Sequence, residues 1–508
     1  MKSLYTLIIL LIIYSSATGQ AEFRDSTFNN NGIITYSSST SISNLPNSTI
    51  IIQNDNKILH STSSYYMGTS KLRRVHPNGI VDSTFSNDGV VSGSLSNFDD
   101  IALQSDNKII WVQNNDSTFT LQRLHQNGDL DSTFGNNGLV SFPIQTTQAI
   151  AVTITCIKNI IIQNDDKILV GGIADYYSLL MRFNVNGTID STFGTNGQMD
   201  INSGQFQELI HNFEIQANGK IIITGEFGGD IFTARLDTSG HLDATFGTNG
   251  ITIVPYSNYE RARKIKFQSD GSIIIAAWSF DYTPMNEQLY NLIIRLTENG
   301  QFDASFGNNG FTIIPSIFNG EGTNDNLLIQ PDDKIILCGD GCKMFRFHSN
   351  GNRDYNFGIN GEIALPFNYI ESVQLQSDNK FIVSGHGGHN TNNPVNFIIR
   401  LNPSALLLNN DIISVDTSQI DFNLNIFPNP LETEGFITYE LTKQSNINIY
   451  ILNGMGQIVQ VIKQNETKDA GKYTEPLILK ELPRRSINYL WLDDGTNHIA
   501  RPFLLKEK

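Results

Sequence analysis

Seven aspartates at regular intervals are the residues of this sequence whose types and spacing could do chemistry. Each begins a stretch whose fullest form is Asp-x-Thr-Phe-Gly-x-Asn-Gly. The carboxylate, hydroxyl and amide oxygens of such a stretch are ligands that calcium prefers. An aspartate at this position also stabilises a turn, because its side chain accepts hydrogen bonds from backbone N–H groups two residues further on. We therefore interpret all seven as structural residues rather than metal ligands: Asp25, Asp82, Asp131, Asp190, Asp243, Asp303 and Asp354.

An arginine precedes the aspartate by eight residues in six of the seven copies. A guanidinium group can bind a carboxylate through two hydrogen bonds, and a partly buried pair of this kind specifies strand register more than it adds stability. The spacing stays constant while neighbouring loops vary in length, which indicates that both residues lie in paired strands. The predicted structural pairs are Arg74 with Asp82, Arg123 with Asp131, Arg182 with Asp190, Arg235 with Asp243, Arg295 with Asp303, and Arg346 with Asp354.

The two remaining members of this pattern lie at opposite ends of the array. Asp25 has no arginine eight residues before it, and Arg400 has no aspartate eight residues after it. If both ends share one sheet, Arg400 pairs with Asp25 and completes the seventh repeat. A closed ring needs such an arrangement because closure protects the sheet edges, whereas a linear solenoid caps its ends instead. The complementary ends therefore predict a ring.

Loops of unequal length supply the candidate ligand-binding residues. A glutamine recurs in every repeat, and the distance from it to the following arginine is 19 residues in three repeats but 27 in the fifth and 24 in the last. Loops on a rigid scaffold often carry binding residues, and repeat insertions fall on one face. We expect the working face to carry loops 278–292 and 384–396. Their aromatic rings suit a sugar or protein ligand, although packing within a strand is the alternative, above all for the tryptophan. The candidates are Trp278, Phe280, Tyr282, Tyr290, His386 and His389.

The other titratable residues form no recognisable catalytic or metal-binding motif. His386 and His389 lack a third protein ligand nearby apart from asparagine, so a surface loop is the favoured interpretation. We find no nucleophile elbow, no phosphate-binding loop and no Cys/His arrangement with the spacing of a known protease. The sequence therefore predicts no catalytic residue, no metal and no cofactor.

Charge and the N-terminus restrict the compartment and the partners. The chain has 34 basic and 50 acidic residues, a net charge of −16, which argues against nucleic-acid binding because that requires clustered Lys and Arg. Residues 1–19 are typical of a signal peptide, with Lys2, an apolar run and a small-x-small cleavage site. No later segment approaches about 18 consecutive apolar residues, so we expect no integral membrane segment after the signal is removed. In an oxidising compartment, Cys338 and Cys342 could form a disulfide if the turn between them permits it.

The elements that position these residues are expected to be short β-strands. Each repeat contains an apolar run, the glutamine, a two-residue turn such as Asp55-Asn56 and a second apolar run, which predicts a type I′ hairpin. A third strand ends at the arginine, and the aspartate stretch begins a fourth, with its phenylalanine in the core. The repeated glutamines are Gln53, Gln104, Gln163, Gln216, Gln268, Gln330 and Gln376. Four strands in each of seven repeats predict an all-β chain with a seven-bladed β-propeller at 20–405, closed by its N- and C-terminal fragments.

Two resemblances accompany this pattern. The repeat signature resembles the delta-60 repeat of bacterial exported proteins over residues 20–405, a family whose name implies no activity. Residues 406–422 are expected to be a linker, and 423–508 a small β-sandwich. Phe427-Pro428-Asn429-Pro430, a Gly-Gln after the central hairpin and a basic C-terminal end resemble the C-terminal sorting domain of the type IX secretion system of Bacteroidetes. That resemblance implies the type IX secretion machinery as a partner, and release or anchoring at the outer cell surface.

The function predicted from the sequence is binding or adhesion, without catalysis, by an exported or cell-surface propeller whose ligand is a glycan or a surface protein. One alternative is a carbohydrate-active hydrolase or lyase with carboxylates in the central channel. Another is a structural component of a surface layer or of gliding machinery. Carboxylates that converge in the channel would favour the enzyme, and an aromatic patch without them would favour the binder.

Overall fold

The computed structural model divides the chain into two compact units, Met1–Asn409 and Asn410–Lys508. Every element of the described residues is a β-strand, and none of these residues lies in an α-helix. The expected signal peptide 1–19 and linker 406–422 lie outside the described residues. The structure describes residues 23–37, 48–64, 69–93, 98–114, 118–143, 156–174, 177–199, 209–256, 259–283, 286–315, 326–339, 342–358, 361–365, 367–387, 395–402, 424–427, 434–441, 443–452, 458–479, 488–493 and 498–503.

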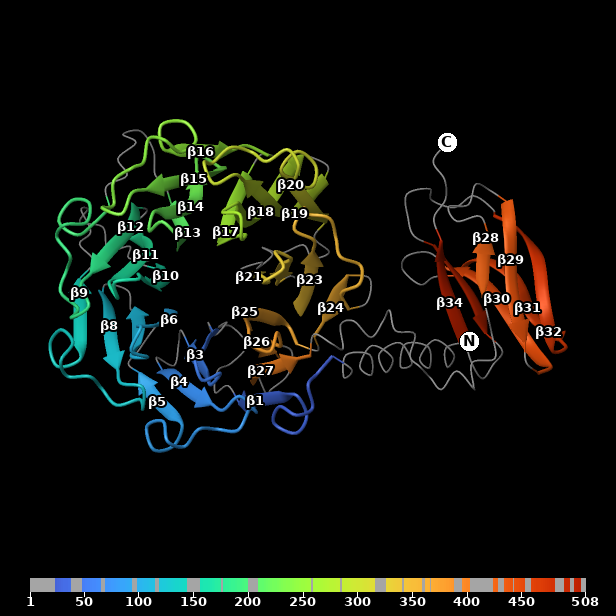
Figure 1. The fold of residues 1–508 in the computed structure, drawn as a ribbon, viewed down its shortest axis with the longest axis horizontal. Coiled ribbons are helices and arrows are strands. Elements are labelled where there is room, and N and C mark those ends of the chain that lie inside the picture. The colour runs from blue at the N-terminus through green and yellow to red at the C-terminus, as the bar shows by residue number, and fades with distance from the viewer. Residues whose placement is uncertain are drawn as a thin grey trace. The chain divides into compact units, whose positions relative to one another are not determined.

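The described part of the first unit forms seven antiparallel sheets, coloured from blue to orange in Figure 1. Sheet 1 contains β2 (Ser48–Ile52), β3 (Ile58–Ser64), β4 (Thr69–Val75) and β5 (Val90–Gly93). Sheet 2 contains β6 (Phe98–Leu103), β7 (Ile109–Asn114), β8 (Thr118–Leu124) and β9 (Leu139–Pro143). Sheet 3 contains β10 (Cys156–Ile162), β11 (Ile168–Ala174) and β12 (Tyr177–Phe183). Sheet 4 contains β13 (Leu209–Ile215), β14 (Ile221–Phe227), β15 (Asp230–Leu236) and β16 (Ile251–Val254). Sheet 5 contains β17 (Tyr259–Phe267), β18 (Ile273–Thr283), β19 (Asn286–Leu296) and β20 (Phe311–Pro315). Sheet 6 contains β21 (Asn326–Ile329), β22 (Ile335–Cys338), β23 (Lys343–Phe347) and β24 (Glu362–Ala364). Sheet 7 contains β25 (Tyr369–Leu375), β26 (Phe381–Gly387), β27 (Val395–Leu401) and β1 (Ile33–Ser37).

The first strands of these sheets contact one another in a closed cycle. β2 contacts β6, and the contacts continue through β10, β13, β17, β21 and β25 back to β2. The first strand of each sheet therefore lies innermost and the later strands lie further out, as Figure 1 shows. A ring of antiparallel sheets around a central axis is the arrangement of a β-propeller.

The two ends of the ring meet in one sheet. β1 pairs antiparallel with β27, with Ile33 opposite Ile399, so the outermost strand of sheet 7 comes from the N-terminal end of the first unit. The backbone N–H of Asp25 donates to the carbonyl of Arg400 at 2.9 Å. Because all the other strands of this sheet follow residue 368, closure requires contacts between residues more than 350 positions apart in the chain.

The hairpin between the first two strands of a sheet turns through three residues rather than two. In sheet 1, the N–H of Asn56 donates to the carbonyl of Gln53 at 2.8 Å, and the N–H of Gln53 donates to that of Lys57 at 2.8 Å. Of the turn residues 54–56, only Asn56 has a positive φ, 62°, whereas a type I′ turn needs positive φ at both central residues. The predicted type I′ turn is therefore wrong, and a type I turn followed by one left-handed residue takes its place.

The core of the first unit lies between neighbouring sheets. The phenylalanine of every aspartate stretch is fully buried, at 0% exposure, and each such side chain contributes about 1.5–3 kcal/mol to folding by leaving water. In the turn that follows the arginine of the next repeat, a glycine lies against this ring. A Cβ added to Gly240, whose φ is +88°, would lie 2.7 Å from the ring of Phe193. The seven rings are those of Phe28, Phe85, Phe134, Phe193, Phe246, Phe306 and Phe357.

The described part of the second unit consists of two antiparallel sheets that share one apolar core. One contains β28 (Asn425–Phe427), β29 (Glu434–Leu441) and β32 (Gly471–Ile478), and the other β31 (Ile458–Lys468), β30 (Ser445–Leu452), β33 (Asn488–Asp493) and β34 (His498–Phe503). Ile437 and Leu477 of the first sheet belong to the same buried cluster as Ile449 and Leu490 of the second. In the described parts of both units, no helix is long and apolar enough to cross a membrane.

Candidate functional site

All seven arginine–aspartate pairs of the predicted pattern are ion pairs in the structure. In six, the arginine Nε lies 2.7–2.9 Å from the aspartate Oδ2, and in the seventh, Arg295 reaches Asp303 through Nη2 at 2.7 Å. The guanidinium group does not bind the carboxylate through two nitrogens in the pair of Arg123 with Asp131. There Nη1 donates to the carbonyl of Val185 in the next repeat at 2.6 Å, and Nη2 donates to Thr133 at 3.0 Å. The arginine therefore holds its own repeat and the next one together.

The repeated aspartates have little capacity left for a metal. Asp25 Oδ1 accepts hydrogen bonds from the N–H and the hydroxyl of Thr27, at 3.0 and 2.6 Å, while Oδ2 lies near Arg400 and Lys380, at 2.9 and 3.0 Å. Burial opposes the charged form, but the contacts with Thr27, Lys380 and Arg400 outweigh it and lower the pKa of Asp25 to about 2. Within the described ranges, no group of three His, Cys, Asp or Glu residues is placed to hold a metal ion.

The aromatic candidates lie mainly in strands rather than in the expected loop 278–292. β18 and β19 extend this region into a long hairpin that includes Trp278, Phe280 and Tyr290. Trp278 is buried, its ring centroid is 5.6 Å from that of Tyr259, and the guanidinium of Arg261 lies 5.7 Å from it. The side chain of Trp278 therefore packs against neighbouring side chains of its own sheet. The side chain of Tyr282 and the whole of His389 lie outside the described residues.

His386 is the candidate that lines the cavity at the centre of the ring. It lies in β26 and is buried, and its Nδ1 is 2.8 Å from a carboxylate oxygen of Glu371. Its ring stacks on Tyr369 with a centroid distance of 4.8 Å. The other candidates whose side chains the structure describes, Trp278 among them, are not part of this lining.

Cys338 and Cys342 are both buried and both free, so the disulfide that the sequence allowed is not formed. The hairpin of β22 and β23 places Met344, not Cys342, opposite Cys338. Cys342 lies before β23, in a left-handed conformation with φ of 56°, and its N–H donates to the carbonyl of Gly339 at 3.0 Å. Burial raises the pKa of Cys342 to about 12, so this thiol is not a nucleophile at neutral pH.

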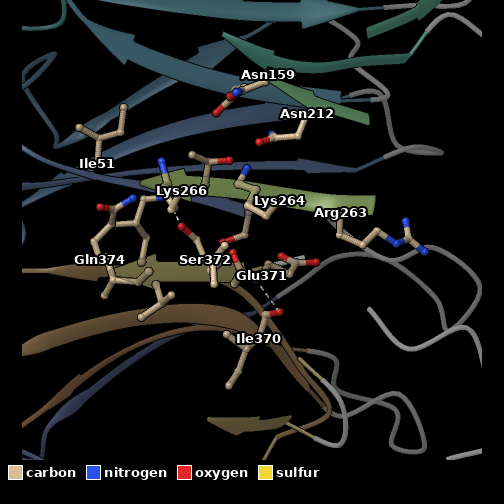
Figure 2. Close-up of a pocket in the computed structure, with 18 of the residues that line it drawn as sticks. Ile51, Asn159, Asn212, Arg263, Lys264, Lys266, Ile370, Glu371, Ser372 and Gln374 are labelled. Carbon is tan, nitrogen blue, oxygen red and sulfur yellow. Dashed lines mark hydrogen bonds between the residues drawn. The ribbon is translucent and has the colours of Figure 1, made fainter. Parts of the chain in front are cut away.

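A cavity of about 720 Å³ lies between the innermost strands, within the size range of about 300–1,000 Å³ that is usual for small-molecule sites. Every innermost strand contributes to its lining the residue four positions before the recurring glutamine. Figure 2 shows several of these side chains, with Asn159 and Asn212 on one side and Ser372 on the other. We call the seven residues the inner ring: Thr49, Asp100, Asn159, Asn212, Lys264, Asn326 and Ser372.

Inner-ring side chains also tie neighbouring innermost strands together. Asn212 Oδ1 accepts a hydrogen bond from the backbone N–H of Ile265 at 3.1 Å, and Asn159 Nδ2 donates to the carbonyl of Phe213 at 2.9 Å. Equivalent bonds link Ser372 with Ile50 and Asn326 with Ile370, each at 3.2 Å. An uncharged polar side chain is therefore sufficient for the structural role of this position.

Asp100 is the acidic member of the inner ring. Its Oδ1 accepts the N–H of Ile101 at 2.9 Å and its Oδ2 accepts the N–H of Ile160 at 3.2 Å. Burial disfavours the charged form and raises the pKa of Asp100 to about 6, although the positive charge of Lys264 and these hydrogen bonds act in the opposite direction. The carboxyl group therefore changes its charge in the range between about pH 5 and 7.

β-Bulges place further charged residues at the cavity. The pairing of the first two strands is interrupted in sheets 3, 4, 5 and 7, and the extra residues include His211, Arg263 and Glu371. A bulge re-aims a side chain that regular alternation would direct elsewhere. As a result, these three residues and their inner-ring neighbours all line the cavity, although they are adjacent in sequence.

The inner ring was not identified from the sequence, although a signal for it was present. The seven positions share a fixed offset from the recurring glutamine, and each holds a polar residue. Alignment of the repeats on the glutamine would therefore have identified the ring. The bulges had no comparable signal, because they depend on the pairing with the second strand.

Comparisons with known proteins agree with this fold. A family model described as "Domain of unknown function (DUF5122) beta-propeller" matches residues 163–193, 216–246 and 268–306, each of which runs from a recurring glutamine to the phenylalanine of the next aspartate stretch. A search of the curated proteins found no match. The three segments are similar to this β-propeller model, which agrees with the ring of sheets.

Several solved structures are similar at low identity. One is the extracellular domain of the putative hybrid two-component system BT3049 from B. thetaiotaomicron, with 10% identity and a TM-score of 0.41; the match covers 94% of this chain but only 58% of that one. PorZ, a surface component of the type IX secretion system of Porphyromonas gingivalis, has 11% identity and a TM-score of 0.28, with 91% and 70% of the two chains covered. The Nup133 β-propeller domain of Vanderwaltozyma polyspora has 13% identity and a TM-score of 0.38, with 72% and 97% covered.

Proposed function

We propose that this chain is an exported, non-catalytic binding propeller that receives its ligand in the central cavity. The seven sheets are its blades, built from delta-60-like repeats at 20–405. Residues 1–19 direct export as a signal peptide. Residues 406–422 link the propeller to a β-sandwich at 423–508, which the type IX secretion machinery recognises as a sorting domain. The protein then acts at the outer surface of a Bacteroidetes-like bacterium or after release from it.

The observation that carries the binding function is the composition of the cavity lining. Seven innermost strands present polar inner-ring residues to one space of about 720 Å³, and their amide and hydroxyl groups can both donate and accept hydrogen bonds. A convergent set of such groups is suited to the recognition of a polar ligand.

Ser48, a residue of the cavity lining, contacts a histidine that is a weak base. Ser48 Oγ lies 2.9 Å from Nε2 of His60, and its other partner is the hydroxyl of Ser384 at 2.7 Å. Burial lowers the pKa of His60 to about 3, so this imidazole is a weak base for the activation of a hydroxyl group. The arrangement therefore favours recognition over chemistry.

A binding screen on the mature chain, residues 20–508, tests this function. The screen uses arrayed glycans and surface proteins, and Gln374→Trp, a substitution at a lining residue, reduces the cavity. Lys71→Trp, at an exposed residue of β4, is the matched control. We expect a ligand that binds the wild-type chain and the control but not Gln374→Trp. Absence of any ligand, or a ligand that binds Gln374→Trp equally well, would overturn the proposal.

A carbohydrate-active hydrolase is the second candidate, because Asp100 and Glu371 both line the cavity. A pKa of about 6 for Asp100 is suitable for a general acid. However, both oxygens of Asp100 accept backbone N–H groups, and Glu371 lies beside His386, so both carboxylates are engaged within the protein. Release of reducing ends from a bound glycan, abolished in Asp100→Asn, would favour the enzyme over the binder.

A further inference from the structure

In sheets 3 and 4, the bonds between neighbouring strands fix which polar atom of each inner-ring side chain is left for a ligand. Asn159 donates through Nδ2 to the carbonyl of Phe213 at 2.9 Å, which leaves its Oδ1, a hydrogen-bond acceptor. Asn212 accepts the N–H of Ile265 through Oδ1 at 3.1 Å, which leaves its Nδ2, a donor. Because a backbone carbonyl only accepts and a backbone N–H only donates, neither amide can be reversed without losing its bond.

The same combination occurs in sheets 6 and 7. Asn326 donates through Nδ2 to the carbonyl of Ile370 at 3.2 Å, so its Oδ1 can accept a further bond. Ser372 accepts the N–H of Ile50 at 3.2 Å, so its O–H can donate. β10 contacts β13 and β21 contacts β25, so an acceptor and a donor lie on neighbouring strands at two places in the ring. We call these the two acceptor–donor pairs: Asn159 with Asn212, and Asn326 with Ser372.

Such a pair selects the kind of chemical group that it can bind. A hydroxyl group both donates and accepts, so two neighbouring hydroxyls of a sugar can satisfy an acceptor and a donor at once. A carboxylate only accepts hydrogen bonds, and an ammonium group only donates them. Either ion would leave one member of the pair out of water without a partner, which lowers affinity. The two acceptor–donor pairs therefore favour an uncharged ligand with several hydroxyl groups.

The two lysines of β17 at the cavity have acidic counterparts within the protein. Lys266 Nζ lies 2.5 Å from a carboxylate oxygen of Glu214. Lys264 lies close enough to Asp100 for its positive charge to act against the effect of burial on the pKa of that carboxyl group. Neither ammonium group is therefore an unmatched charge that attracts an anion.

The remaining charges of the lining also have partners. The guanidinium group of Arg263 lies 5.7 Å from the ring centroid of Trp278, at the distance of a cation–π contact, and Figure 2 shows Arg263 directed away from Lys264. A carboxylate oxygen of Glu371 lies 2.8 Å from Nδ1 of His386. An ionic ligand would have to displace one of these contacts or lose its hydration without a countercharge.

We infer that the cavity binds an uncharged saccharide whose neighbouring hydroxyl groups bond to the two acceptor–donor pairs. Apolar side chains such as Ile51 and Leu328 also belong to the lining, and they suit the C–H groups of a sugar ring. The volume of about 720 Å³ is sufficient for a small oligosaccharide. This inference rests on the proposed binding function and specifies the class of ligand for the same cavity.

Titration calorimetry of the mature chain with matched trisaccharides tests the inference. The neutral probes are trimers of glucose, of mannose and of galactose. Each is compared with the uronic acid trimer of the same linkage, which differs from it only in its carboxylates. We expect at least one neutral trimer to bind about tenfold or more tightly than its acidic counterpart, with an affinity that changes little as salt increases.

Asn212→Asp changes the donor of one pair into an acceptor and keeps the oxygen that binds the N–H of Ile265. The ring accommodates aspartate at this position, because Asp100 makes the equivalent bond with the N–H of Ile160 at 3.2 Å. We expect Asn212→Asp to bind the neutral trimer about tenfold or more weakly. Asn352→Asp adds the same charge at an exposed residue outside the cavity lining, and it should leave the affinity unchanged.

The result that overturns this inference differs from the one that overturns the binding function. Equal or tighter binding of the acidic trimers, or wild-type affinity for the neutral trimer in Asn212→Asp, would refute an uncharged saccharide. If Asn212→Asp does not fold, the comparison of trimers on the wild-type chain still decides. If no trimer binds but another ligand of the screen is lost in Gln374→Trp, this inference fails and the binding function stands. If nothing binds at all, the binding function itself fails.

Discussion

The buried carboxyl group of Asp100 allows a quantitative prediction about stability and pH. Its pKa is about 6 in the folded protein, against about 3.9 for an unperturbed aspartate in an unfolded chain. The difference of about two corresponds to about 3 kcal/mol, because one pKa unit is worth about 1.4 kcal/mol. Asp100 is almost fully buried, so solvent does little to reduce this value.

The sign of the effect follows from which state binds the proton more tightly. The folded protein binds the proton more tightly, because the pKa of Asp100 is higher in the folded state than in the unfolded state. The stability of the folded protein therefore increases as pH falls from above about 6 to about 4. At higher pH, the charged carboxylate costs the folded state about 3 kcal/mol relative to low pH. The amide that replaces the carboxyl group in Asp100→Asn does not titrate. We expect the free energy of unfolding of Asp100→Asn, relative to wild type, to be larger by about 2.4 kcal/mol at about pH 7.5 than at about pH 4, because the carboxyl group of the unfolded chain is already about half ionised at pH 4.

Urea unfolding of the mature chain at several pH values between about 4 and 7.5 measures this difference. Trp111 is fully buried in β7 of the same sheet, so its fluorescence reports on the unfolding of this region. The matched control is Asp106→Asn, at the hairpin of sheet 2, where the pKa is lowered because hydrogen bonds and charge from Lys108 outweigh burial. That control should shift slightly in the opposite direction. A free-energy difference for Asp100→Asn that is constant over this range, or larger at the acidic end, would refute the reasoning.

Two further predictions concern the repeated ion pair and the thiols. Arg182→Met should lower the free energy of unfolding by about 3–5 kcal/mol, because it leaves the carboxylate of Asp190 buried without its main partner. Lys167 is more exposed and lies 3.2 Å from the same carboxylate, so Lys167→Met should lower the free energy of unfolding by less than about 1 kcal/mol. Urea denaturation compares the two, and equal effects would contradict the assignment of Arg182 as the main partner. Cys338 and Cys342 should react with a thiol reagent only after unfolding, because both are buried and free. Peptide mapping after labelling measures the reaction of each thiol. Rapid labelling of either cysteine in the folded protein would contradict the prediction.

The sequence determined those features that depend on local pattern at constant spacing. The repeated Arg and Asp lie eight positions apart, so a strand and its turn must bring them together whatever surrounds them, as the ion pair of Arg182 with Asp190 at 2.7 Å shows. The burial of each repeated phenylalanine follows from the same repeat. The ends of the array predicted that Asp25 and Arg400 lie together, because Asp25 lacks an arginine eight residues before it and Arg400 lacks an aspartate eight residues after it. The two residues form an ion pair in the structure.

Only the tertiary structure decided what the repeats enclose. The loop expected at 278–292 is largely strand, because β18 and β19 continue to pair past the ends of their neighbours. Arg263 and Lys264 both line the cavity because the first strand bulges where it pairs with the second. Neither effect is local: strand length and bulge position depend on pairing, and the cavity exists only where seven innermost strands meet. Residues hundreds of positions apart thus form the candidate site, and no window of the sequence contains them together.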